Sequence, residues 1–133
     1  MFMLTMGAGM NMGFPDTCLT PAVVPVPIPY PNMQFSATSS PAAYNVLVDC
    51  MPVLNQLSMG SASVGDQGGV LLGVVSHLID GNAIYMVGCI TIIVGGAPAQ
   101  RLTSVTGQNC MVVLPNGPGA CLTPSQATVL TLG

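Results

Sequence analysis

This sequence is almost without charge. Among its 133 residues there are four acidic side chains, all Asp, and one basic side chain, Arg101, and there is no Trp. In an ordinary soluble domain about a quarter of the residues are charged. A surface with a single Arg cannot neutralise a run of phosphates, which excludes nucleic acid as a partner. So few charges also lead us to expect exposed apolar patches, and large patches of that kind mark interaction surfaces.

A long uninterrupted apolar helix is also missing. Residues 82–100 (NAIYMVGCITIIVGGAPAQ) carry no charge and approach the length of a membrane span. Three glycines and Pro98 interrupt them, and β-branched residues are frequent, so two short strands joined by a turn fit better. Residues 1–13 lack a basic segment followed by a long apolar core. We therefore expect no signal peptide, synthesis in the cytosol, and export only by another route.

The chemistry-bearing side chains form no recognisable catalytic pattern. The five cysteines are odd in number and include no CxxC pair. We expect reduced, buried thiols, and leave open a disulfide between Cys18 and Cys121 after export. His77 is the only histidine, and no spacing selects a cysteine to pair with it, so a loop or core histidine is favoured over a catalytic one. Arg101 is expected to pair with an aspartate or with carbonyls. Asp16 and Asp66 read as turn-capping residues rather than an acid–base pair.

Proline is abundant in one stretch, residues 18–32 (CLTPAVVPVPIPYPN), where it occupies five of the fifteen positions. Each proline fixes φ and removes a backbone donor, which excludes a helix and a central strand. The prediction is a stiff extended rod whose valines pack along the domain. The alternative is a proline-rich spacer or ligand. Residues 1–13, rich in Met and Gly, read either as an adaptable arm for a partner or as a frayed terminus.

An internal repeat organises the rest of the chain. Residues 46–58 (VLVDCMPVLNQLS) align without gaps to residues 92–104 (IIVGGAPAQRLTS) at an offset of 46, and CLTP occurs at both 18–21 and 121–124. This indicates pseudo-symmetric β units in a single all-β domain covering residues 1–133. The short strands expected are residues 44–48, 53–58, 70–77, 83–87, 89–94, 99–103, 111–114 and 127–132.

Several motifs resemble those of the PAAR-like proteins of bacterial type VI secretion. They are FPDTCLTPAVVPVPIPYPN at residues 14–32, VGDQGGV at 64–70, VGGAPAQRLTS at 94–104, TGQN at 106–109 and NGPGACLTPSQATVL at 116–130. The resemblance implies a small conical β domain that caps a trimeric VgrG spike, one chain on three subunits. It also implies effector recruitment, help in puncturing a membrane, and export on the spike to the extracellular space or a target cell.

The resemblance also raises the question of zinc binding, because typical PAAR tips hold a zinc ion with histidines and a cysteine. Here the positions near PAQR and TGQN where a histidine is expected read Leu102 and Gln108. His77 and three of the five cysteines would be enough ligands for a zinc ion, but their spacing in the sequence matches no known zinc motif. We therefore expect no catalytic residue, no metal site and no cofactor. The interpretation is a non-enzymatic spike-tip protein, with a membrane-active effector and a thiol- or zinc-dependent enzyme as the alternatives.

Overall fold

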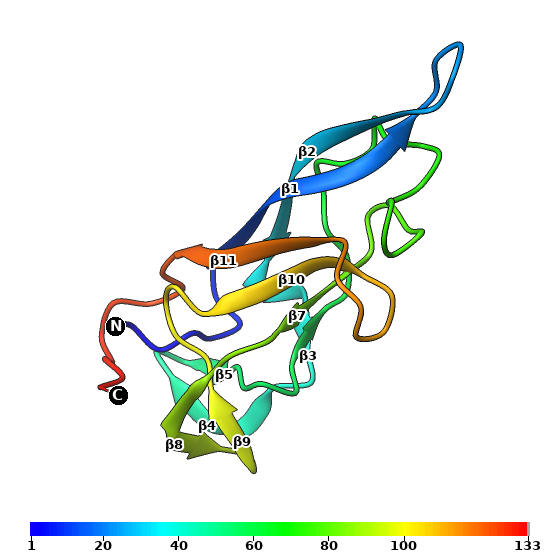
Figure 1. The fold of residues 1–133 in the computed structure, drawn as a ribbon. Helices are drawn as coiled ribbons and strands as arrows, with labels where there is room; N and C mark the ends of the chain where they lie inside the picture. The colour runs from blue at the N-terminus through cyan, green and yellow to red at the C-terminus, as the bar shows by residue number, and fades with distance from the viewer. Residues whose placement is uncertain (133) are drawn as a thin grey trace.

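The computed structural model describes residues 1–132 and is built almost entirely of short strands (Figure 1). The elements are β1 (Met10–Thr20), β2 (Val26–Phe35), the 3-10 turn η1 (Ser36–Thr38), β3 (Ser39–Ser40), β4 (Ala43–Val48), β5 (Met51–Val53), β6 (Met59–Gly60), β7 (Asn82–Tyr85), β8 (Cys89–Val94), β9 (Ala97–Ala99), β10 (Val105–Cys110) and β11 (Gly117–Thr123). The all-β prediction is confirmed. Within these residues no helix is long and apolar enough to cross a membrane.

Most strands belong to one sheet, in the order β2-β1-β11-β10-β7-β6-β3. The proline-rich stretch lies at the edge of this sheet, but it is not one rod. Residues 18–20 end β1, the chain reverses, and residues 26–32 return as the first part of β2. Prolines in β2 are tolerated because an edge strand does not need to donate on its outer side. The packing predicted for the valines is wrong at the turn between β1 and β2. There Val23 is fully exposed and Val24 is largely exposed.

The internal repeat forms two matching hairpins, β4–β5 and β8–β9. Ala43 pairs with Val53 and Cys89 with Ala99, Val48 with Met51 and Val94 with Ala97. Every partner in one hairpin is shifted by 46 residues from its counterpart in the other, including the bulge. The longer strand of each hairpin also has the same burial pattern. The turns are equivalent too, because Asp49-Cys50 and Gly95-Gly96 all have positive φ.

A third copy of this unit comes from the start of the chain. Three backbone hydrogen bonds close a ring: Leu4 N donates to Gln100 O (2.9 Å), Gln100 N to Leu54 O (3.0 Å) and Leu54 N to Leu4 O (3.0 Å). A second set repeats the pattern, as Met6 N donates to Pro52 O, Gln56 N to Pro98 O, and Leu102 N to Phe2 O, at 2.9, 2.9 and 2.8 Å. We call residues 2–6, 52–56 and 98–102 the three-fold ring.

Serine hydroxyls complete the three-fold ring. Ser58 Oγ accepts from Asn55 N at 3.1 Å and Ser104 Oγ from Arg101 N at 3.0 Å. In the third unit the equivalent bond, from Thr5 N at 2.7 Å, is accepted by Ser125 from the other end of the sequence. Residues 129–131 run beside that unit through an isolated Phe2–Leu130 bridge, with Met3 N donating to Val129 O. Residues 1–13 are therefore not a frayed terminus, since residues 2–6 form part of the ring and residues 10–13 begin β1.

Apolar burial is concentrated at the three-fold ring. One cluster contains Met3, Val53 and Ala99, which are ring equivalents, and a second contains Leu4 and Leu54. The interior farther along the main sheet is polar instead. Its fully buried side chains include Asn11, whose Nδ2 donates to Gln34 and, at 3.0 Å, to the Tyr85 hydroxyl. Buried amides are stable only when hydrogen-bonded in this way.

Several predicted strands are wrong. Residues 70–77 form turns, with Leu72 and His77 at positive φ, and residues 111–114 form a tight turn closed by a Met111–Leu114 bridge. Residues 127–132 form no strand, and pair with the start of the chain through the isolated Phe2–Leu130 bridge and backbone bonds to residues 1 and 3. The strands β10 and β11 were missed, because β10 is largely polar and fully buried over residues 106–109.

Candidate functional site

The end of the molecule that holds the two hairpins exposes apolar side chains at equivalent positions of the repeat. Leu47 and Ile93 are equivalent by the 46-residue offset and are 61% and 67% exposed. Tyr44 and Ile90 form a second exposed pair. In the third unit the exposed apolar residues are Met1, Leu130 and Leu132. We call this surface the apolar base. Figure 1 shows the hairpins β4–β5 and β8–β9 at the lower end, far from the turn of the β1–β2 hairpin.

The opposite end of the molecule is also apolar. The β1–β2 turn lies beside residues 70–75, which pair with β1 through Leu71 N to Leu19 O (3.1 Å) and Val74 N to Thr17 O (3.0 Å). This end, the distal tip, exposes a group of aliphatic side chains: Val23, Val24, Val26, Ile28, Val70, Leu71, Leu72, Val74 and Val75. An exposed patch of this kind in a nearly uncharged chain is unusual for a free surface.

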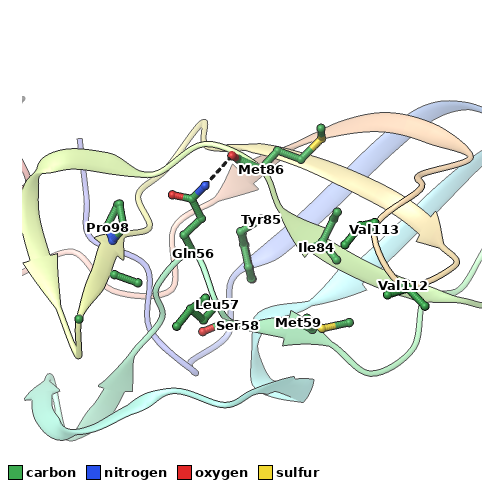
Figure 2. Close-up of a pocket in the computed structure, with 12 residues that line it drawn as sticks. Gln56, Leu57, Ser58, Met59, Ile84, Tyr85, Met86, Pro98, Val112 and Val113 are labelled. Carbon is green, nitrogen blue, oxygen red and sulfur yellow. Dashed lines mark hydrogen bonds between the residues drawn. The ribbon is translucent and has the colours of Figure 1, made fainter.

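An apolar groove lies between the ring and the main sheet (Figure 2). Its volume is about 630 Å³, and the side chains that line it include Leu57, Met59, Ile84 and Val113. Gln56 closes one side by donating from Nε2 to Met86 O at 3.0 Å. Concave and mainly apolar surfaces are the usual sites for binding a partner's side chains.

Beneath the distal tip lies a buried group that we call the acidic cluster: Asp16, Cys18 and Asp66. All three residues are 0% exposed. Cys18 Sγ lies 3.8 Å from Asp16 Oδ1 and 3.8 Å from Asp66 Oδ2. Three amides donate to the carboxylates, Asn32 and Asn116 to Asp16 and Asn109 to Asp66. The prediction that the aspartates are separate turn caps is therefore wrong, although Asp66 also accepts from Asp80 N, as a turn residue would.

Burial changes the acidity of this cluster. Burial, together with the neighbouring Asp16 and Asp66 carboxylates, raises the pKa of the Cys18 thiol to about 12. Burial, together with a side-chain hydrogen bond to Asp80, raises the pKa of Asp66 to about 7. A thiol in such surroundings stays protonated at neutral pH and is not a nucleophile. The cluster therefore offers ligands and protons rather than covalent catalysis.

The glycines of GDQGG let the backbone approach this cluster. A Cβ placed on Gly69 would lie 2.1 Å from the Cβ of Cys18, so Gly69→Ala should cost about 3 kcal/mol of stability by overpacking. Gly96→Ala is the control, since nothing lies within 4 Å of the added carbon and Cys50 holds the equivalent position. It should cost about 1 kcal/mol for its left-handed backbone. Urea unfolding of both variants measures the difference, and equal costs would contradict this packing.

The other residues considered from the sequence do not join the cluster. His77 lies exposed in the loop at residues 70–78, so the set of His77 with three cysteines does not form. Cys50 is exposed, and Cys18 and Cys121 are separate buried thiols. Arg101 belongs to the three-fold ring, where its backbone bridges to Met3. Leu102 packs against the second apolar cluster and Gln108 is buried in β10, neither of them near a histidine.

Comparison with known proteins gives one match. The sequence model of the Toxin PAAR-like domain family matches residues 9–115, which is more than half of the chain. The chain belongs to the toxin PAAR-like domain family. The sequence resemblance to PAAR-like proteins is thereby confirmed. No curated protein and no solved structure is detectably similar to the chain.

The family match includes two thirds of the three-fold ring and the whole acidic cluster. Residues 2–6 and Ser125, which complete the third unit, lie outside the matched range. The family is described as a toxin PAAR-like domain and is not a known enzyme family. The candidate functional surfaces of this PAAR-like domain are therefore its two apolar ends and the groove.

Proposed function

We propose that this PAAR-like domain is the tip of a type VI secretion spike and caps a trimeric VgrG-like protein. The observation that supports this is the three-fold ring, in which three separate segments of one chain make the same backbone hydrogen bonds. A monomer with pseudo-three-fold symmetry at one end fits a partner with true three-fold symmetry. The exposed aliphatic residues of the apolar base supply the area that such docking would bury.

Backbone pairing would add to apolar contact at this interface. The hairpins β4–β5 and β8–β9 are separate two-stranded sheets, and their outer strands have no further strand beside them within residues 1–132. Unpaired strand edges of this kind readily accept another chain. The charge-poor base makes few ion pairs possible, so the affinity should change little between low and high salt.

A pull-down from lysate of the native host tests this proposal. The tagged chain should capture a trimeric spike protein, and a variant with the apolar base disrupted should not. Capture of the spike by both proteins would show that the base is not the docking surface.

The distal tip supports a second part of the proposed function, transient contact with the target membrane during puncture. Burying aliphatic side chains in a bilayer is favourable by about 0.8 kcal/mol per methylene. The double variant Val23→Asp/Val24→Asp should lower binding to liposomes at least about tenfold, because it places charges at the most exposed point. Spike binding should be unchanged. Equal liposome binding by the variant and the parent protein would rule out this role.

The apolar groove is the proposed place for effector recruitment. It lies beside the ring, between Gln56 and Met86 (Figure 2), and in this proposal it stays open on a capped spike. Val113 is 76% exposed at its rim, and Val113→Asp should not disturb the fold. Proteins exported with the spike should lose the cargo in this variant while the spike itself is still exported. An unchanged set of exported proteins would contradict the assignment.

A further inference from the structure

The motifs that run through this sequence meet at the acidic cluster. The residues concerned come from FPDTC, PYPN, GDQGG, TGQN and NGPG, and are Asp16, Cys18, Asn32, Asp66, Asn109 and Asn116. Docking on a spike, membrane contact and the groove use none of them. We propose that Asp16, Cys18 and Asp66 bind one divalent cation of the zinc class, through two carboxylates and a thiolate and without histidine.

The spacing of the donor atoms fits such a cation. One ligand atom from each of the three residues lies within 4.8 Å of the others, and both sulfur–oxygen distances are 3.8 Å. With zinc–sulfur near 2.3 Å and zinc–oxygen near 2.1 Å, tetrahedral ligands stand about 3.6 Å apart. The 3.8 Å contacts, which in this structure are long hydrogen bonds from the thiol, are also close to this ligand separation. Small shifts of the side chains would therefore enclose an ion.

The distribution of charge also favours a cation. Asp16 and Asp66 are fully buried, and Asp80 adjoins them through its backbone N–H to Asp66, so three of the four acidic residues in the chain gather here. Arg101, the only Lys or Arg, belongs to the three-fold ring instead. Burying carboxylates without a positive partner is costly. A bound divalent cation removes that cost.

The surrounding amides hold the carboxylates as an outer shell. Asn109 is fixed at both ends, its Nδ2 donating to Asp66 and its Oδ1 accepting from Gly81 N. Asn116 is fixed likewise, its Nδ2 donating to Asp16 and its Oδ1 accepting from Val75 N. Outer partners of this kind orient the ligands of metal sites.

One buried polar atom in this shell has no partner. Asn32 is 0% exposed and its Nδ2 reaches into the cluster to donate to Asp16 at 2.7 Å, yet its Oδ1 makes no hydrogen bond. A buried amide oxygen left in this way costs stability unless something binds it. A water on the cation, or the cation itself, would supply the missing partner.

The thiol selects the class of ion. Sites built only of carboxylate and carbonyl oxygen suit magnesium and calcium, whereas a thiolate favours zinc. On binding, the sulfur–metal bond forms as the Cys18 S–H bond breaks, and the proton passes to solvent. This site differs from the histidine–cysteine set considered from the sequence, in which His77 would have been the ligand.

Titration of the isolated, chelator-treated chain with Zn²⁺ and Co²⁺ tests the proposal, in a Cys50→Ser background that removes the exposed thiol. One Co²⁺ per chain should bind, with a near-ultraviolet thiolate-to-cobalt absorption band, and Zn²⁺ should displace it. Cys18→Ser should abolish the band, while Cys110→Ser, another buried cysteine, should retain it. Asp66→Asn keeps the side-chain shape. It should weaken metal binding by at least about 10- to 100-fold, which is the loss typically seen when a residue that only hydrogen-bonds to a metal ligand is changed.

Three results would overturn the proposal: no stoichiometric binding of either ion, a thiolate band that survives Cys18→Ser, or preferential binding of Ca²⁺ without a band. If Cys18→Ser does not fold, Asp66→Asn decides, and unchanged affinity in that variant counts against the site. The spike is absent from this experiment, so its outcome is independent of the docking proposal.

Discussion

The double variant Leu47→Asp/Ile93→Asp should fold normally and lose binding to a trimeric spike protein by at least about 100-fold, or about 2.7 kcal/mol. The two residues are equivalent positions in the repeated hairpins, and both are more than half exposed, so the substitutions disturb no core packing. At the interface they would bury two carboxylates in apolar surroundings, which costs several kcal/mol when they find no partner. Calorimetry or surface capture with the purified spike gives the change in affinity.

The matched control is Val23→Asp/Val24→Asp, which adds the same charge at the distal tip. It should bind the spike as the parent protein does. If the base variant binds normally, or both variants are equally impaired, the apolar base is not the docking surface.

Leu4→Ala should destabilise the domain by about 2–5 kcal/mol, a large share of the 5–15 kcal/mol that holds a typical domain folded. Leu4 is 1% exposed, packs with Leu54 in the second apolar cluster, and belongs to the three-fold ring. Leu54→Ala should cost a similar amount. Because the two side chains share one cluster, the cost of the double variant should depart from the sum of the single costs.

Leu57→Ala is the control for these measurements, since Leu57 is 63% exposed and should lose less than about 0.5 kcal/mol. Denaturant unfolding followed by circular dichroism gives all four values. If Leu4→Ala lowered the free energy of unfolding as little as Leu57→Ala, residues 2–6 would not be packed in the ring. The ring would then have only two well-packed segments.

The sequence was informative where the repeat was strong. The offset of 46 residues correctly paired the hairpins β4–β5 and β8–β9, because similar apolar positions and two-residue turns of positive φ produce the same register. The third unit has no comparable signal. Only the apolar pair Met3-Leu4 parallels Val53-Leu54, and the unit is completed by Ser125, more than a hundred residues away.

Other parts of the fold could not be predicted because they reverse the usual pattern of apolar residues inside and polar residues outside. Residues 70–75 are as apolar as a buried strand yet form exposed turns. β10 has the opposite character, since Thr106, Gln108 and Asn109 are polar and fully buried. Predicting strands from periodicity assumes that apolar residues lie inside the domain. That assumption fails for a domain with apolar ends and a polar interior.

The acidic cluster could be predicted only in part. Asp16 and Asp66 stood in recognisable motifs, but they lie fifty residues apart and nothing local shows that they meet. Their meeting depends on the hydrogen bonds of residues 70–74 to β1, which carry the GDQGG loop onto Cys18. Long-range backbone pairing of that kind is a property of the folded sheet and not of any one motif.

The mass of the complex formed between this chain and a trimeric VgrG-like protein tests the central proposal most directly. Native mass spectrometry should give one chain on three spike subunits, because a ring with three similar faces in one chain can cover one three-fold end only once. The complex should persist at high salt, since its contacts are apolar and backbone-mediated. A complex with one chain per spike subunit, or one that dissociates at moderate salt, would contradict the account.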